Sequence, residues 1–136
     1  IVMGFILEHV ESPVAILNRF KRLLRPGGRI FAAVPNAESL HRRIGAAAGL
    51  MPDLFELSES DEALGHRRYF SVDSLKTLAE GCGLRAVRTR GIYLKPFTTA
   101  QIEKLALSGD VLQAMIETGE DYPELCAAFL MEFDLA

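Results

Sequence analysis

The sequence has few cysteines, and they stand where neither a disulfide framework nor a metal centre is expected. Cys82 and Cys126 are the only two, they lie far apart, and each is surrounded by apolar residues. Small disulfide-rich domains carry many closely spaced cysteines, so that class is excluded. The pattern instead favours buried thiols in a reducing compartment.

Long apolar runs and a strong charge of one sign are also lacking. No apolar run approaches the roughly 18 residues that cross a bilayer, and no signal-peptide pattern opens the chain, so we predict a cytoplasmic protein without membrane contact. The formal net charge is −3, and the arginine pairs Arg42-Arg43 and Arg67-Arg68 are separated by acidic stretches. A nucleic-acid partner is therefore not expected.

The chain does contain enough apolar sequence for a folded core. Hydrophobic residues make up 49% and charged residues 24% of the chain, which predicts one globular domain over residues 1–136. The clearest signal lies between Arg25 and Asn36, where a Pro-Gly-Gly turn precedes the apolar run from Ile30 to Val34. That order predicts a turn and then a buried parallel strand, which Pro35 should end. Ligands bind beyond the carboxyl ends of such strands, so Asn36 is a candidate substrate-binding residue.

Helical and strand patterns alternate along the rest of the chain. Ile1 to Gly4 is typical of the end of a buried strand, and Ser12 followed by Pro13 is typical of a helix start. With the strand at Arg29 to Val34 they form a strand–helix–strand unit, which implies a parallel sheet and an α/β fold. We expect the further elements to be a helix at Ser39 to Ala48, a loop at Leu50 to Gly65, a helix capped by Ser71, an edge strand at Leu84 to Leu94, and helices at Thr99 to Ser108 and Val111 to Glu117. By periodicity Leu125 to Leu135 can be helix or strand, and its part from Phe129 to Phe133 favours strand.

The pair Glu8-His9 stands just past the first expected strand and before the first helix. A carboxylate beside an imidazole can act as an acid or a base, or can bind a metal ion. Alternatively, His9 bonds loop backbone while Glu8 faces the start of the helix. Phe5 and Ser12, one helical turn to either side, supply no further carboxylate or imidazole, so no metal site is predicted.

A second polar group lies just before the helix that Ser71 should cap. The stretch from Gly65 to Ser71 places His66, Arg67, Arg68 and Tyr69 together, and these side chains could grip an anionic or hydroxylated substrate. The alternative is a hydrophobic staple of Phe70 against Leu75, with solvated arginines. For His41, which is followed by Arg42 and Arg43, the expectation is an exposed helix face.

Five short blocks stand out when the chain is taken as a whole. They are Phe5 to Pro13, Leu23 to Gly28, Val34 to Asn36, Gly65 to Ser71 and Cys82 to Leu84. In this order and spacing they resemble class I S-adenosylmethionine-dependent methyltransferases, and the resemblance covers residues 1 to about 95.

The resemblance implies a Rossmann-like sheet of which this chain carries the second half. Ile1 to Gly4, Arg29 to Val34, Leu84 to Leu94 and Ala127 to Leu135 would be the fourth to seventh strands, so parallel strands would be joined by a terminal antiparallel hairpin. The chain would then be the C-terminal part of a methyltransferase domain. The family's glycine-rich cofactor loop and its ribose-binding acidic residue are expected upstream of Ile1.

The resemblance also assigns the candidate site residues. Gly4, Phe5 and Ile6 would lie beside the methionine part of the cofactor S-adenosyl-L-methionine, with Glu8 on the adjoining loop. The acceptor would be bordered by His66, Arg67 and Tyr69. His9 and His66 are the candidates for a catalytic base.

Two functions remain open from the sequence. One is methyl transfer to a small-molecule acceptor, in which this chain supplies the acceptor-side half and is inactive alone. The other is a non-catalytic binding or assembly module that keeps the half-fold and pairs with another chain. An uncovered parallel strand is a template for pairing, so the exposed side of the first strand predicts a homodimer.

Overall fold

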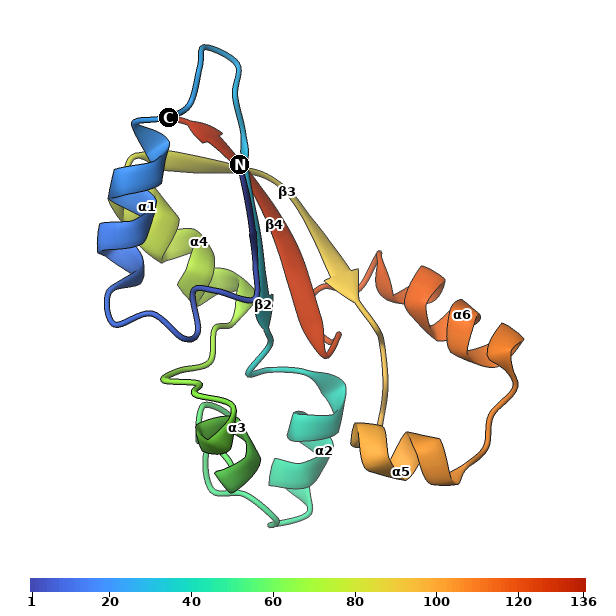
Figure 1. Cartoon of the computed structure of the whole chain (residues 1–136). Helices are drawn as coiled ribbons and strands as arrows, with labels where there is room; N and C mark the ends of the chain where they lie inside the picture. Colours follow the sequence, from blue (N-terminus) through green and yellow to red (C-terminus); the bar gives the residue numbers. More distant parts are fainter.

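The computed structural model describes residues 1–136, which form a four-stranded sheet with helices around it (Figure 1). The strands are β1 (Val2–Gly4), β2 (Ile30–Pro35), β3 (Leu84–Ile92) and β4 (Ala128–Leu135). The helices are α1 (Pro13–Lys21), α2 (Leu40–Ala47), α3 (Glu59–Ala63), α4 (Val72–Gly81), α5 (Thr99–Lys104) and α6 (Gly109–Gly119).

The sheet is mixed, as the sequence predicts. Its spatial order is β1-β2-β4-β3, in which β1 and β2 are parallel and β4 runs antiparallel to both of its neighbours. The last strand therefore lies between β2 and β3, and β3 is an edge strand as expected. The ambiguous segment Leu125 to Leu135 is a strand for most of its length, because β4 has a partner on either side to satisfy its backbone.

The core lies between one face of the sheet and the helices α1 and α4 (Figure 1). Leu17 of α1 and Leu75 of α4 are fully buried with Val34 and Phe129 of the central strands. Phe70 and Leu75 are both buried in this cluster, at the two positions that a hydrophobic staple at the start of α4 would use. Burial of this apolar surface fixes α1 and α4 on the sheet.

Both predicted helix caps are present. The Ser12 side chain accepts a hydrogen bond from the Ala15 backbone at the start of α1, and Ser71 accepts one from Ser74 at the start of α4. Just beyond α4, Gly83 takes a φ of +70°, a left-handed conformation that glycine adopts without a steric cost.

Of two sequence expectations about local structure, the end of β2 is confirmed and the loop after α2 is wrong in part. Pro35 is the last residue of β2, so the strand ends there as predicted, and Pro35 lies opposite Ala128 of β4. Its nitrogen needs no partner because β1 pairs with β2 only as far as Gly4 and Ala33. The segment from Leu50 to Gly65 is not wholly a loop, since it contains the short helix α3 with a Ser58–Asp61 capping box.

The two cysteines are unpaired and buried, as predicted. The Cys126 thiol donates to the carbonyl of Gly119 in α6, and its burial raises the pKa to about 11. Opposite it, a Cβ on Gly91 of β3 would lie 2.2 Å from the Gly119 carbonyl oxygen. Glycine at position 91 therefore allows β3 and the end of α6 to approach this closely.

The carboxyl ends of β1 and β2 lie at the same end of the sheet, and α2 and α3 gather there (Figure 1). The chain that leaves β3 also turns toward this end and enters α5. None of the helices has both the length and the apolar composition needed to cross a membrane.

Candidate functional site

The end of β1 presents open backbone and exposed apolar side chains. A Cβ placed on Gly4 would meet no atom within 4 Å. Phe5 follows with a φ of 54°, and the side chains of Phe5 and Ile6 are 47% and 43% exposed. A ligand can thus approach the backbone here closely and cover apolar surface.

The loop beyond Ile6 then turns into the protein and is held by Arg68. The Arg68 guanidinium donates to the backbone carbonyls of Leu7, Val10 and Glu11. The Arg67 backbone N–H donates to the carbonyl of Glu8, while the Arg67 side chain is exposed. The expectation of two solvated arginines is therefore wrong for Arg68, whose donors dock the segment before α4 onto the loop after β1.

This docking brings His66 beside Glu8 and His9. One ligand atom from each of the three side chains lies within 4.8 Å of the others, and we call this group the carboxylate–imidazole cluster. The His9 Nε2 atom is 3.9 Å from Glu8 Oε1, and the two imidazole rings meet edge to face with centroids 4.8 Å apart. Sequence analysis named Glu8-His9 and His66 as separate candidates, and the folded chain brings the three side chains together.

Glu8 is the most unusual member of the cluster. Its side chain is fully buried, and neither carboxylate oxygen has a hydrogen-bond partner. Burial raises the pKa of this carboxyl, against opposing contributions from its own nearby backbone N–H, which is not aligned for a hydrogen bond, and from His9 and His66. Ser12, and not Glu8, caps α1, so whether Glu8 faces the start of that helix stays a prediction. The other half of the alternative is confirmed, because His9 bonds loop backbone, with Nδ1 3.1 Å from the Gly65 carbonyl oxygen.

Asp61 links the cluster to a second feature of the site. The His66 Nδ1 atom is 3.5 Å from Asp61 Oδ1, and the Tyr69 hydroxyl donates to the same oxygen at 3.0 Å. Burial pulls the pKa of Asp61 upward, but hydrogen bonds from Ser58 and Tyr69 outweigh it and leave the pKa lowered. Asp61 is therefore an ionised hydrogen-bond acceptor at neutral pH.

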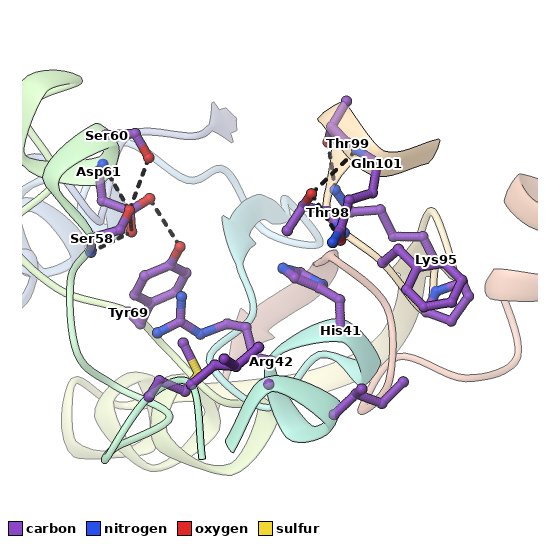
Figure 2. Close-up of a pocket in the computed structure, with 16 residues that line it drawn as sticks. His41, Arg42, Ser58, Ser60, Asp61, Tyr69, Lys95, Thr98, Thr99 and Gln101 are labelled. Carbon is purple, nitrogen blue, oxygen red and sulfur yellow. Dashed lines mark hydrogen bonds between the residues drawn. The ribbon is translucent and has the colours of Figure 1, made fainter. Parts of the chain in front are cut away.

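A cavity of about 670 Å³ opens on the other side of Asp61 and Tyr69, and we call it the α2–α5 cavity. In Figure 2, Asp61 and Tyr69 lie on one side, Lys95 and Gln101 lie on the other, and His41 lies between them. Among these lining residues, sequence reasoning assigned only Tyr69 to a binding site. A signal was available for Lys95, which follows the carboxyl end of a predicted strand.

Arg42 corrects the expectation of an exposed helix face on α2. It is 5% exposed, it donates to the backbone carbonyls of Leu54 and Glu56, and its guanidinium lies 4.1 Å from the centroid of the Tyr69 ring. The positive charge of Arg42 is therefore stabilised by contacts inside the protein, with two carbonyl oxygens and the face of the Tyr69 ring.

Burial sets the protonation of two further groups in the cavity wall. It raises the pKa of Tyr69 to about 12, so the phenol keeps its proton at neutral pH. It lowers the pKa of His41 to about 4, with further lowering by Lys95 and Arg42, so this imidazole is neutral. The His41 Nδ1 atom is buried without a hydrogen-bond partner.

Asn36 lies beyond β2, as predicted, but its side chain is 1% exposed. Its amide donates to the carbonyls of Pro123, Glu124 and Cys126, and its side-chain oxygen accepts from the Glu38 N–H. These contacts tie the end of β2 to the segment that enters β4. Substrate binding by Asn36 stays a prediction, and nothing local in the sequence indicated this clamp.

Comparison with known proteins identifies the family to which the chain belongs. A family model described as a methyltransferase domain matches residues 1–89. The chain belongs to this methyltransferase family. The matched residues include β1, β2, α4 and the whole carboxylate–imidazole cluster, whereas α5, α6 and β4 lie outside the match. A search of the curated proteins finds no match.

Solved methyltransferase structures share the fold. An S-adenosylmethionine-dependent methyltransferase from Mesorhizobium loti is 13% identical, with a TM-score of 0.57 over 97% of this chain and 59% of that one. A chain in the complex of the Trm112 methyltransferase activator with a methyltransferase from Haloferax volcanii is 14% identical, with a TM-score of 0.53 over 98% and 52%. A protein described as a sarcosine dimethylglycine methyltransferase from Galdieria sulphuraria is 15% identical, with a TM-score of 0.50 over 97% and 51%.

The chain thus spans between about half and three fifths of the length of these solved methyltransferases. At these identities the likeness concerns the fold. It confirms the predicted α/β class, in which parallel strands are combined with a final antiparallel strand.

Proposed function

We propose that this chain supplies the acceptor-side half of an S-adenosylmethionine-dependent methyltransferase that acts on a small molecule. The observation that carries the proposal is the carboxylate–imidazole cluster at the carboxyl end of β1, within residues matched by the methyltransferase family. Ligands of open α/β sheets bind at this end of the strands. The α2–α5 cavity is separated from this cluster by Asp61 and Tyr69, which line it, and it offers room for an acceptor.

The cofactor would lie beside Gly4, Phe5 and Ile6. The open backbone at Gly4 and the exposed side chains of Phe5 and Ile6 suit the aliphatic methionine part of S-adenosyl-L-methionine. The Glu8 carboxylate is fully buried, so in this proposal it serves the cofactor site indirectly, by holding charge next to His9 and His66.

When bound, S-adenosylmethionine supplies an electrophilic methyl group: a lone pair of the acceptor atom forms the new bond to carbon, while the carbon–sulfur bond breaks and its electron pair stays on sulfur. His9 or His66 would take the proton that an acceptor O–H or N–H gives up. The buried Glu8 carboxylate would stabilise the imidazolium that results. Arg67 and Tyr69 would border the acceptor and align it for in-line transfer.

Calorimetric titration of S-adenosylhomocysteine tests the proposal. We expect it to bind the full-length protein that contains this chain, and not residues 1–136 alone. Transfer of a labelled methyl group from S-adenosylmethionine into a deproteinised small-molecule extract of cells should then follow. Binding to neither protein would contradict the proposal.

The same assay decides what the carboxylate–imidazole cluster holds. One carboxylate and two imidazoles are of the donor types that bind zinc and related ions, although the sequence predicts no metal. If the cluster transfers protons, a chelator leaves methyl transfer unchanged. Loss of transfer with the chelator, and recovery with a divalent cation, would assign the three side chains to a metal instead.

One observation favours the second candidate function, a non-catalytic assembly module. In this chain β1 is at the edge of the sheet, and Val2 there is 77% exposed. An unpaired strand edge can take up a strand from a second copy. Sedimentation should then show a concentration-dependent dimer that Val2→Lys weakens, whereas a monomer at all concentrations would count against strand pairing.

A further inference from the structure

Lys95 is a buried cation with little to balance it. It is 7% exposed, yet it forms no ion pair with any carboxylate. Its ammonium donates one hydrogen bond, to the Thr99 hydroxyl at 2.5 Å, and lies 5.6 Å from the centroid of the Tyr93 ring. An ammonium has three donors, so two remain for a ligand in the α2–α5 cavity that Lys95 lines.

The other charges of the cavity wall are already occupied. Arg42 bonds two backbone carbonyls and stacks on Tyr69. Asp61 accepts from the backbone and side chain of Ser58 and from Tyr69. With His41 neutral, two cations and one carboxylate leave one positive charge in excess. Lys95 is the cation whose only hydrogen-bond partner is a hydroxyl, since Arg42 is held by two backbone carbonyls.

Buried charges are costly unless they are paired. Burial alone lowers the pKa of Lys95, because no anion of the protein offsets the cost of burying its charge. The buried Nδ1 atom of His41 adds a second free polar atom, on the same wall. Apolar side chains complete the cavity, namely Ile44, Leu50, Met51 and Phe97.

The cavity also reaches toward the proposed reaction centre. Tyr69 lines it, and Tyr69 and His66 both contact Asp61 Oδ1. A molecule in the cavity with its acidic group on Lys95 thus lies one hydrogen-bonded layer from the carboxylate–imidazole cluster.

We propose that the acceptor carries an anionic group, a carboxylate or a phosphate, which Lys95 binds inside the α2–α5 cavity while its apolar part packs on the Phe97 side. This inference rests on the proposed function, whose acceptor it narrows to small organic acids. The cavity volume of about 670 Å³ is in the usual range for such ligands.

The test is calorimetric titration of three matched probes into the full-length protein saturated with S-adenosylhomocysteine. The probes are phenylacetate, phenyl phosphate and the neutral phenylacetamide. We expect at least one of the two anions to bind about tenfold or more tightly than the amide, because a charge-assisted hydrogen bond is replaced by a neutral one. The tighter anion identifies the acidic group.

Variants locate the effect. Lys95→Gln should bring the affinity for the anions down to that for the amide and leave the amide unchanged, and Lys95→Arg should keep the preference. Lys104→Gln makes the same charge change at an exposed position outside the cavity and should keep it too. Equal affinity for anions and amide in the unmodified protein, no binding by any probe, or an unchanged preference in Lys95→Gln overturns the inference.

The two proposals can fail separately. If S-adenosylhomocysteine binds but no preference for anions exists, the inference about Lys95 fails and the methyltransferase proposal stands. If S-adenosylhomocysteine does not bind, the titrations are made on the protein alone, and a preference for anions that Lys95→Gln removes supports the anion site without methyl transfer.

Discussion

Glu8 and Asn36 are two buried polar side chains in equivalent places, each in the segment beyond the carboxyl end of a parallel strand. Every donor and acceptor of the Asn36 amide is used by backbone groups. The Glu8 carboxylate has no hydrogen-bond partner at all. Burial of a polar side chain therefore has opposite effects on stability in the two places: a group with hydrogen-bond partners stabilises the fold, and a group without them lowers its stability.

The surroundings explain why the costly group is of functional interest. Asn36 is enclosed by backbone that it holds together, whereas Glu8 faces two imidazoles. Titratable groups that are poorly satisfied and close to one another are typical of reaction centres. The four predictions that follow test this contrast, in order of decreasing expected effect.

The largest effect is expected at the histidines beside Glu8. His66→Ala or His9→Ala should lower the rate of labelled methyl transfer by the full-length protein by about 10²- to 10⁴-fold, the usual contribution of a general acid or base. Arg85→Ala, on the exposed edge strand β3, is the control and should transfer at the normal rate. Normal rates for both histidine variants would remove His9 and His66 from the mechanism.

Asn36→Ala should produce the largest loss of stability. It leaves three carbonyls without their donor, that of Cys126 buried, and we expect the free energy of unfolding to fall by about 3 kcal/mol. Urea denaturation of the full-length protein measures this. A normal free energy of unfolding together with loss of acceptor binding would instead support the substrate role that the sequence predicts for Asn36.

Glu8→Gln should change stability in the opposite direction, and with a dependence on pH. Because the folded-state pKa of Glu8 is raised above the ordinary value of 4.5, the stability that its protonated form contributes is present below about pH 4.5 and is lost as the pH rises through the folded-state pKa. Glutamine has no charge to bury, so the variant's free energy of unfolding relative to that of the unmodified protein should be higher at pH 7 than at pH 4. Thermal unfolding at the two values checks it, and a loss at pH 7 would show that the ionised carboxylate stabilises the fold.

The smallest effect is expected at the arginine that docks the two loops. Arg68→Lys keeps the charge but loses the fork that spans three backbone carbonyls, so we expect about 1 kcal/mol less stability. The matched control is Arg67→Lys, whose side chain is exposed and whose free energy of unfolding should not change. Equal stability of both variants would mean that the docking does not depend on the guanidinium.

The local structure of this protein could be predicted from its sequence to a large extent. Serine at positions 12 and 71 signals the starts of α1 and α4, and the apolar run from Ile30 marks a buried strand. These signals are short-range, because a cap or an apolar pattern acts on residues within one turn or one strand. Periodicity did not decide between helix and strand for β4, since that choice depends on strands from distant parts of the chain.

By itself, the sequence determined the order of most elements, the α/β class and the resemblance to methyltransferases, because caps, turns and motif spacing are written in neighbouring residues. Only the tertiary structure decided that Arg68 brings His66 to Glu8, that Arg42 is buried against Tyr69, and that Lys95 has no counter-charge. Each of these depends on contacts between residues far apart in the chain. A local pattern shows which side chains carry charge, but burial and partners follow from packing.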